Sequence, residues 1–97
     1  HKIYGPETND LVLQLRKRKF NKVILAGMSS NLCVESHMRE LLEQGFEVAV
    51  VKDATAGAKV LEGNGYESAL VNYRMLANTV LTTEEVIRQL REVTASV

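Results

Sequence analysis

The stretch of sequence that decides the fold runs from Lys22 to Cys33 and reads KVILAGMSSNLC. After the lysine comes a short apolar run ended by Gly27, the pattern of a strand buried on both faces. Residues 28–31 form a loop with helix-capping character, and helical spacing of apolar side chains follows from Leu32 to Gln44. The stretch therefore predicts a strand, a tight turn, and Cys33 in the first turn of a helix.

The same alternation continues on both sides of this stretch. Periodicity predicts helices over residues 7–19 and 66–77, a second buried strand over 46–51 and a shorter strand over 79–81. Residues 52–65 predict a loop with one helical turn at most, and the capping box of Thr82 and Glu85 opens a last helix. Alternating strands and helices predict an α/β fold: a parallel sheet with helices on both faces, a Rossmann-like three-layer sandwich of about three strands and four helices.

The chain has 97 residues, which allows one small domain. Three parallel strands are few for an independent sheet, because an apolar edge would stay open. We therefore expect residues 1–97 to be the C-terminal half of a single larger α/β domain, whose other half supplies further strands.

The composition excludes several classes of protein. Twelve Lys and Arg balance twelve Asp and Glu, so the strong basic field of a nucleic-acid-binding protein is absent. No apolar run approaches the ~18 residues that span a bilayer. A single cysteine forms neither an internal disulfide nor a cysteine-based zinc site, so we expect a reduced, cytoplasmic protein.

Cys33 is the residue with the clearest chemical potential. The N-terminus of a helix offers unpaired N–H groups and a partial positive charge, which lower the pKa of a thiol and favour the nucleophilic thiolate. The same N–H groups can stabilise the oxyanion of a tetrahedral intermediate. The alternative is a small hydrophobic residue of the core, the usual fate of a free cysteine.

The sequence around Cys33 resembles the isochorismatase-like cysteine hydrolases, which include the nicotinamidases. Four groups of residues carry the resemblance: Gly27–Ser36, Arg39, Gly45–Val48 and Val51–Thr55. It extends from about Lys2 to Leu90 and covers roughly the second half of the family fold. That fold is a mainly parallel six-stranded sheet between layers of helices, and its catalytic triad is Asp, Lys and Cys.

The resemblance implies roles for particular residues. Cys33 corresponds to the nucleophile and Lys2 to the triad lysine. A cis peptide is implied between Met28 and Ser29, and an oxyanion hole formed by the backbone N–H groups of Ser29 and Cys33. Tyr4 and Asn31 are expected to line the substrate pocket.

Other parts of the family site have no counterpart in this sequence. The triad Asp comes from the first strand of the family fold, which these residues do not include. Asp53 does not suit that role by position, and we expect it to cap or fix the loop that follows it. The metal-binding Asp and His residues of nicotinamidases have no match either, so no metal and no cofactor are expected.

Two neighbours of Cys33 on its helix suggest further hypotheses. His37 lies one turn after Cys33 and could form a Cys–His dyad, although a packing role is the alternative. Glu35 and Arg39 are four residues apart and are expected to form a structural ion pair.

Two functions of different classes remain open from the sequence. The first is a cysteine-dependent hydrolase that acts on a small amide-like substrate through a covalent Cys33 intermediate. The second is a non-catalytic binding or assembly module, a relative that lacks the triad Asp. We expect a small-molecule substrate, and either a homo-oligomer or completion by the N-terminal half, with neither nucleic acid nor membrane as partner. A flavodoxin-like cofactor binder is disfavoured, because no glycine-rich phosphate loop follows any strand.

Overall fold

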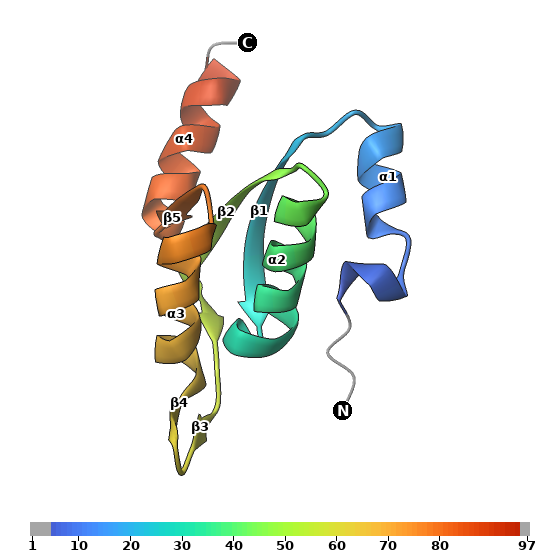
Figure 1. Cartoon of the computed structure of the whole chain (residues 1–97). Helices are drawn as coiled ribbons and strands as arrows, with labels where there is room; N and C mark the ends of the chain where they lie inside the picture. Colours follow the sequence, from blue (N-terminus) through green and yellow to red (C-terminus); the bar gives the residue numbers. More distant parts are fainter. Residues whose placement is uncertain (1–4, 96–97) are drawn as a thin grey trace.

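The computed structural model of the chain describes residues 5–95. Its centre is a parallel sheet of three strands in the order β1-β2-β5, formed by β1 (Lys22–Met28), β2 (Glu47–Ala56) and β5 (Thr79–Leu81) (Figure 1). Helices α2 (Glu35–Glu43) and α3 (Gly65–Leu76) connect these strands. The α/β fold with a three-stranded parallel sheet, predicted from the alternating periodicity, is confirmed.

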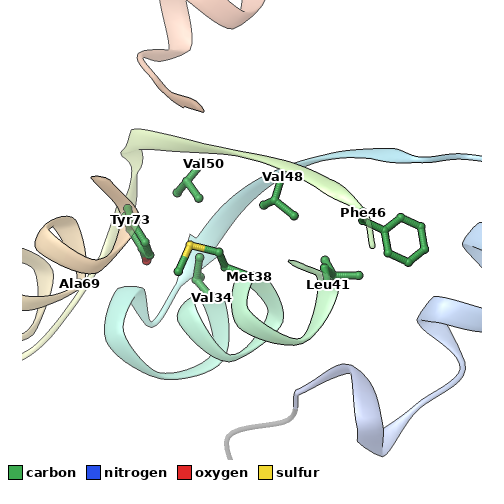
Figure 2. Packing of buried hydrophobic residues seen from close by; sticks show 8 residues of the cluster. All are labelled: Val34, Met38, Leu41, Phe46, Val48, Val50, Ala69 and Tyr73. Atoms are coloured by element: carbon green, nitrogen blue, oxygen red, sulfur yellow. The ribbon is translucent and has the colours of Figure 1, made fainter. Parts of the chain in front are cut away.

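The hydrophobic core lies between the sheet and helices α2 and α3. Alternate residues of β2 point to opposite faces of the sheet, so Val48 and Val50 share the face toward these helices. Figure 2 shows the side chains that fill this layer. They are Val34, Met38, Leu41, Phe46, Val48, Val50, Ala69 and Tyr73, all buried.

Helix α4 (Thr83–Ala95) packs on the opposite face of the sheet. With Ile24, Ala49 and Leu81 of the sheet, its residues Val86 and Leu90 line a groove of about 350 Å³. Ile24 of β1 is 49% exposed, so this face is covered only in part. The helices therefore form layers on both sides of the sheet, but only the layer with α2 and α3 encloses a complete core.

The N-terminal helical segment is interrupted. The expected helix over 7–19 is observed as a short 3-10 turn (Pro6–Thr8) followed by α1 (Leu11–Lys17). Asn9 between them has an extended backbone, and its side chain accepts a hydrogen bond from the Leu11 N–H at 2.9 Å. This Asn–backbone bond competes with helical pairing and separates the two pieces.

The prediction for residues 52–65 was wrong. Strand β2 continues to Ala56 because its last residues pair with the end of β1, with Thr55 opposite Gly27 and Ala56 opposite Met28. The following residues form a small antiparallel hairpin, β3 (Lys59–Val60) and β4 (Gly63–Asn64). A segment poor in apolar residues forms strands here because backbone pairing with a distant strand and a short hairpin satisfies its polar groups.

Side chains cap the N-termini of helices α3 and α4. Thr82 and Glu85 form the predicted capping box: the Glu85 carboxylate accepts from the Thr82 N–H at 3.1 Å, and the Thr82 hydroxyl accepts from the Glu85 N–H at 3.2 Å. Asn64 caps α3 by accepting from the N–H groups of Tyr66 and Glu67.

Within residues 5–95, no helix is both long and apolar enough to cross a membrane.

Candidate active site

Cys33 lies in a turn at the carboxyl end of β1. The peptide bond between Met28 and Ser29, where the strand ends, is cis. The Ser29 carbonyl then accepts hydrogen bonds from the backbone N–H groups of Leu32 and Val34, both at 3.1 Å. The second bond spans five residues, so Ser30–Val34 form a π-helical turn, and regular α-helix begins only at Glu35.

This corrects the expectation that the helix begins at Leu32. Cys33 does not occupy the first turn of an α-helix but a wider turn that precedes one, because a single carbonyl, that of Ser29, accepts two of the N–H groups of the segment. The Cys33 side chain is partly buried there and makes no disulfide. Single π-helical turns next to regular α-helix occur frequently at functional sites.

Residues 58–65, which comprise the hairpin and the first residue of α3, face the cysteine-bearing turn across a depression of about 330 Å³. Ser29, Asn31 and Leu32 of the turn line one side of it, and the hairpin with Ser68 of α3 lines the other. The structure thus brings Ser29 and Asn31 into one cavity. Cys33 is not among the residues that line it.

Asn31 is held close to the hairpin. A Cβ atom added to Gly65 would lie 2.7 Å from the Asn31 Oδ1 atom and 2.9 Å from the Ala58 carbonyl oxygen. The Gly65 N–H donates to that same carbonyl at 2.8 Å. A glycine is therefore required at position 65 for the hairpin and the turn to approach this closely.

His37 does not form a dyad with the Cys33 thiol in this structure. Its Nδ1–H donates a 2.8 Å hydrogen bond to the backbone carbonyl of Cys33. Glu35 and Arg39 form the predicted ion pair at 3.0 Å, and Asn72 of α3 also donates to the Glu35 carboxylate. These polar contacts attach the first turn of α2 to the cysteine turn and to α3.

Asp53 has a different partner from the expected one. Its carboxylate accepts hydrogen bonds from the Thr83 N–H at 2.7 Å and from the Thr83 hydroxyl at 2.8 Å. These two bonds hold the pKa of Asp53 below its usual value. Asp53 therefore fixes the start of α4 rather than the loop that directly follows it.

One contact of the turn was missed at the sequence level. The buried hydroxyl of Tyr73, on α3, donates a short hydrogen bond to the Ser30 carbonyl. Tyr73 lies one helical turn after Ala69, and both side chains are buried. A buried tyrosine hydroxyl needs a polar partner, which was the available signal that Tyr73 would contact a backbone group.

Two predicted site residues, Lys2 and Tyr4, lie outside the described residues. Within residues 5–95, no three His, Cys, Asp or Glu side chains gather closely enough to hold a metal ion.

The sequence and the fold both match known proteins. The family model described as the isochorismatase domain matches residues 2–85. The chain belongs to the isochorismatase family. The resemblance noted around Cys33 is thereby confirmed at the level of the family.

Individual relatives show how much of the family fold is covered. Isochorismatase family protein 2A of Dictyostelium discoideum is 34% identical over 89 residues, which are 90% of this chain and 43% of that protein. A cysteine hydrolase from Pseudomonas syringae pv. phaseolicola 1448A is 25% identical with a TM-score of 0.80, over 86% of this chain and 43% of that one. A nicotinamidase from Bacillus subtilis is 26% identical with a TM-score of 0.69, over 81% and 42%. The chain spans less than half the length of each of these relatives.

Proposed function

We propose that this chain carries the nucleophile of a cysteine-dependent hydrolase that acts on a small amide-like substrate, and that Cys33 is this nucleophile. The observation that supports it most directly is the turn formed by the two hydrogen bonds to the Ser29 carbonyl. This turn holds the only cysteine of the chain at the carboxyl end of β1, the end of parallel strands at which α/β proteins bind ligands.

The proposed reaction proceeds through a thioester. The Cys33 thiolate attacks the amide carbon, a C–S bond forms, and the carbonyl oxygen becomes an oxyanion that accepts from the N–H groups of Ser29 and Cys33. The C–N bond then breaks, and the amine leaves with the proton that came from the thiol. Water hydrolyses the thioester, which releases a carboxylic acid and restores the thiol.

Two further groups belong to this proposal by family resemblance. The ammonium of Lys2 would favour the ionised thiol and the oxyanion. An aspartate from the part of the family fold that this sequence does not include would carry the proton from the thiol to the leaving amine. We propose Asn31 and Tyr4 as substrate contacts, Asn31 because it lines the depression between the turn and the hairpin.

The organisation of the whole protein is part of the same proposal. We infer that residues 1–97 are the C-terminal half of one isochorismatase-like domain, and that the groove between the sheet and α4 receives the remaining half or a second copy of the chain. The partly exposed Ile24 on the open face of the sheet supports this. It equally supports the second candidate, a non-catalytic assembly module. We propose a cytoplasmic location, because the nucleophilic role proposed for Cys33 requires a reduced thiol.

The pH dependence of Cys33 alkylation separates the two candidates. Iodoacetamide reacts with the thiolate, so its rate reports the pKa of the thiol. The same chain unfolded in urea is the internal reference, with a midpoint near the free-thiol value of ~8.5. A clearly lower midpoint in the folded chain supports the nucleophile, and a Cys33→Ser variant confirms that the signal comes from this thiol. A folded chain with an ordinary midpoint, or with an unreactive thiol, contradicts the hydrolase and favours the assembly module.

A further inference from the structure

The cysteine-bearing turn is attached to the rest of the protein by a buried tyrosine. Tyr73 is completely buried, and Figure 2 shows it at the end of the core away from Phe46. Its hydroxyl donates to the carbonyl of Ser30, a residue 43 positions earlier in the chain that is also completely buried. This bond links α3 directly to the turn between Ser29 and Cys33.

The surroundings of this bond are polar but sealed from solvent. The hydroxyls of Ser30 and of Thr55 are buried and lack hydrogen-bond partners. Both lie close enough to Tyr73 to lower its pKa, but burial outweighs them and raises the pKa of Tyr73 to about 12. The phenol is therefore neutral near pH 7 and keeps the proton that it donates to Ser30.

The position of the Ser30 carbonyl matters for the chemistry proposed above. Ser30 directly follows Ser29, whose N–H is a proposed oxyanion donor, and precedes Cys33 by three residues. Ser30 is sealed from solvent, and the two other buried hydroxyls near Tyr73, those of Ser30 and Thr55, do not bond to this carbonyl in the present geometry. Without the Tyr73 hydroxyl the turn would have to move to satisfy the carbonyl, and a displacement of about 1 Å can cost about 100-fold in rate.

We propose that Tyr73 is a positioning residue of the Cys33 site, whose buried hydroxyl holds the Ser30 carbonyl and thereby fixes the turn that presents the thiol. This inference rests on the proposed nucleophilic role of Cys33. It assigns to a core residue of α3 a function beyond packing.

The chain supplies a matched control for the test. Tyr66 is on the same helix, and its hydroxyl also donates to a backbone carbonyl, that of Lys52 in β2, at 2.7 Å. Tyr66→Phe and Tyr73→Phe each remove one oxygen atom and one hydrogen bond. Only the second variant removes a contact with the cysteine turn.

The first measurement is the pH midpoint of Cys33 alkylation by iodoacetamide in the full chain. We expect Tyr73→Phe to move the midpoint toward the free-thiol value. Tyr66→Phe is expected to keep the wild-type midpoint. A wild-type midpoint that is low and unchanged in Tyr73→Phe overturns the inference and leaves the proposed function standing, whereas an ordinary wild-type midpoint counts against the proposed function itself.

The second measurement is hydrogen exchange of the Leu32 and Val34 amides, whose bonds to Ser29 define the turn. Hydrogen exchange reports on the turn even if the thiol of Cys33 reacts like that of a free cysteine. We expect exchange about tenfold faster or more in Tyr73→Phe, and unchanged exchange in Tyr66→Phe. Equal acceleration in both variants would overturn the inference, because it would reflect a general loosening of α3. Loss of the fold in Tyr73→Phe alone would also overturn it, since the hydroxyl would then support the whole core rather than the turn.

Discussion

Asp53 lies in the part of β2 beyond the predicted end of the strand. Its carboxylate accepts hydrogen bonds from the backbone N–H and the side-chain hydroxyl of Thr83, at 2.7 and 2.8 Å. The two residues are 30 positions apart, and Thr83 is the first residue of α4. An acceptor at this position satisfies a helical N–H group that would otherwise have no intrahelical partner. Asp53 therefore connects the sheet to the helix on its partly open face.

This contact predicts a pH dependence of stability. The Thr83 bonds favour the ionised form of Asp53 and lower its pKa. A carboxyl group with a lowered pKa in the folded state stabilises the fold above its unfolded pKa, and this stabilisation is lost as the pH falls through the folded pKa. The urea midpoint of the wild type should therefore exceed that of Asp53→Asn at about pH 6 and approach it at about pH 3.

The Asn side chain keeps an acceptor oxygen and removes only the charge, so the comparison isolates ionisation. Glu85, whose pKa is also lowered by its bonds to Thr82, is present in both proteins and cancels. A constant difference between the two midpoints over this pH range would contradict the prediction.

The core prediction concerns Leu41, which is completely buried between α2 and the sheet. Leu41→Ala removes buried methyl groups and leaves a cavity, and we expect it to lower the free energy of unfolding by about 2–5 kcal/mol. Leu13→Ala is the control: Leu13, on α1, is 57% exposed, so a change within about 0.5 kcal/mol is expected. Chemical denaturation followed by circular dichroism measures both. Equal losses in the two variants would show that the assigned core is wrong.

A third prediction concerns the close approach of the hairpin to the cysteine turn. Gly65→Ala would place a methyl group 2.7 Å from the Asn31 side chain and 2.9 Å from the Ala58 carbonyl. We expect a loss of about 1–3 kcal/mol in the free energy of unfolding and a displacement of Asn31. Amide chemical shifts of residues 29–33 would report that displacement.

Gly63→Ala is the matched control for this substitution. Gly63 belongs to the same hairpin, but a Cβ atom there meets no other atom within 4 Å. In the Gly63→Ala protein, the amide chemical shifts around Asn31 should stay at their wild-type values. A Gly65→Ala protein as stable as Gly63→Ala would show that the hairpin adapts freely to the turn.

The open face of the sheet gives a fourth prediction, which tests the proposed completion of the domain. Ile24→Lys places a charge on the groove shared by the sheet and α4. We expect this variant to show weaker self-association, or weaker binding to the rest of the family domain, in light scattering coupled to size exclusion. Leu61→Lys is the control, because Leu61 lies at the tip of the hairpin and is 98% exposed. If only the Leu61 variant loses association, the docking surface is the hairpin and the groove proposal is wrong.

Much of the fold could be predicted because its signals are local. The strand after Lys22, the strand at Thr79–Leu81 and the capping box at Thr82 each depend on a few neighbouring residues. Of the candidate site, the expected cis peptide between Met28 and Ser29 is present and Asn31 lines the depression, whereas the roles of Cys33 and Asn31 stay predictions. Lys2 and Tyr4 stay predictions, since they lie outside the described residues.

The sequence by itself determined the order of the three strands of the parallel sheet and of the α-helices, because hydrophobic periodicity and capping residues act over one or two turns of chain. Only the tertiary structure decided how far β2 extends, which carboxylate of the sheet accepts the Thr83 N–H of α4, and which hydroxyl donates to the cysteine turn. Each of these depends on a contact between residues far apart in sequence. Thr55 pairs with Gly27 in the sheet, and hydrogen bonds join Asp53 to Thr83 and Tyr73 to Ser30. Such partners become neighbours only when the sheet and its helices have packed, so no local pattern encodes them.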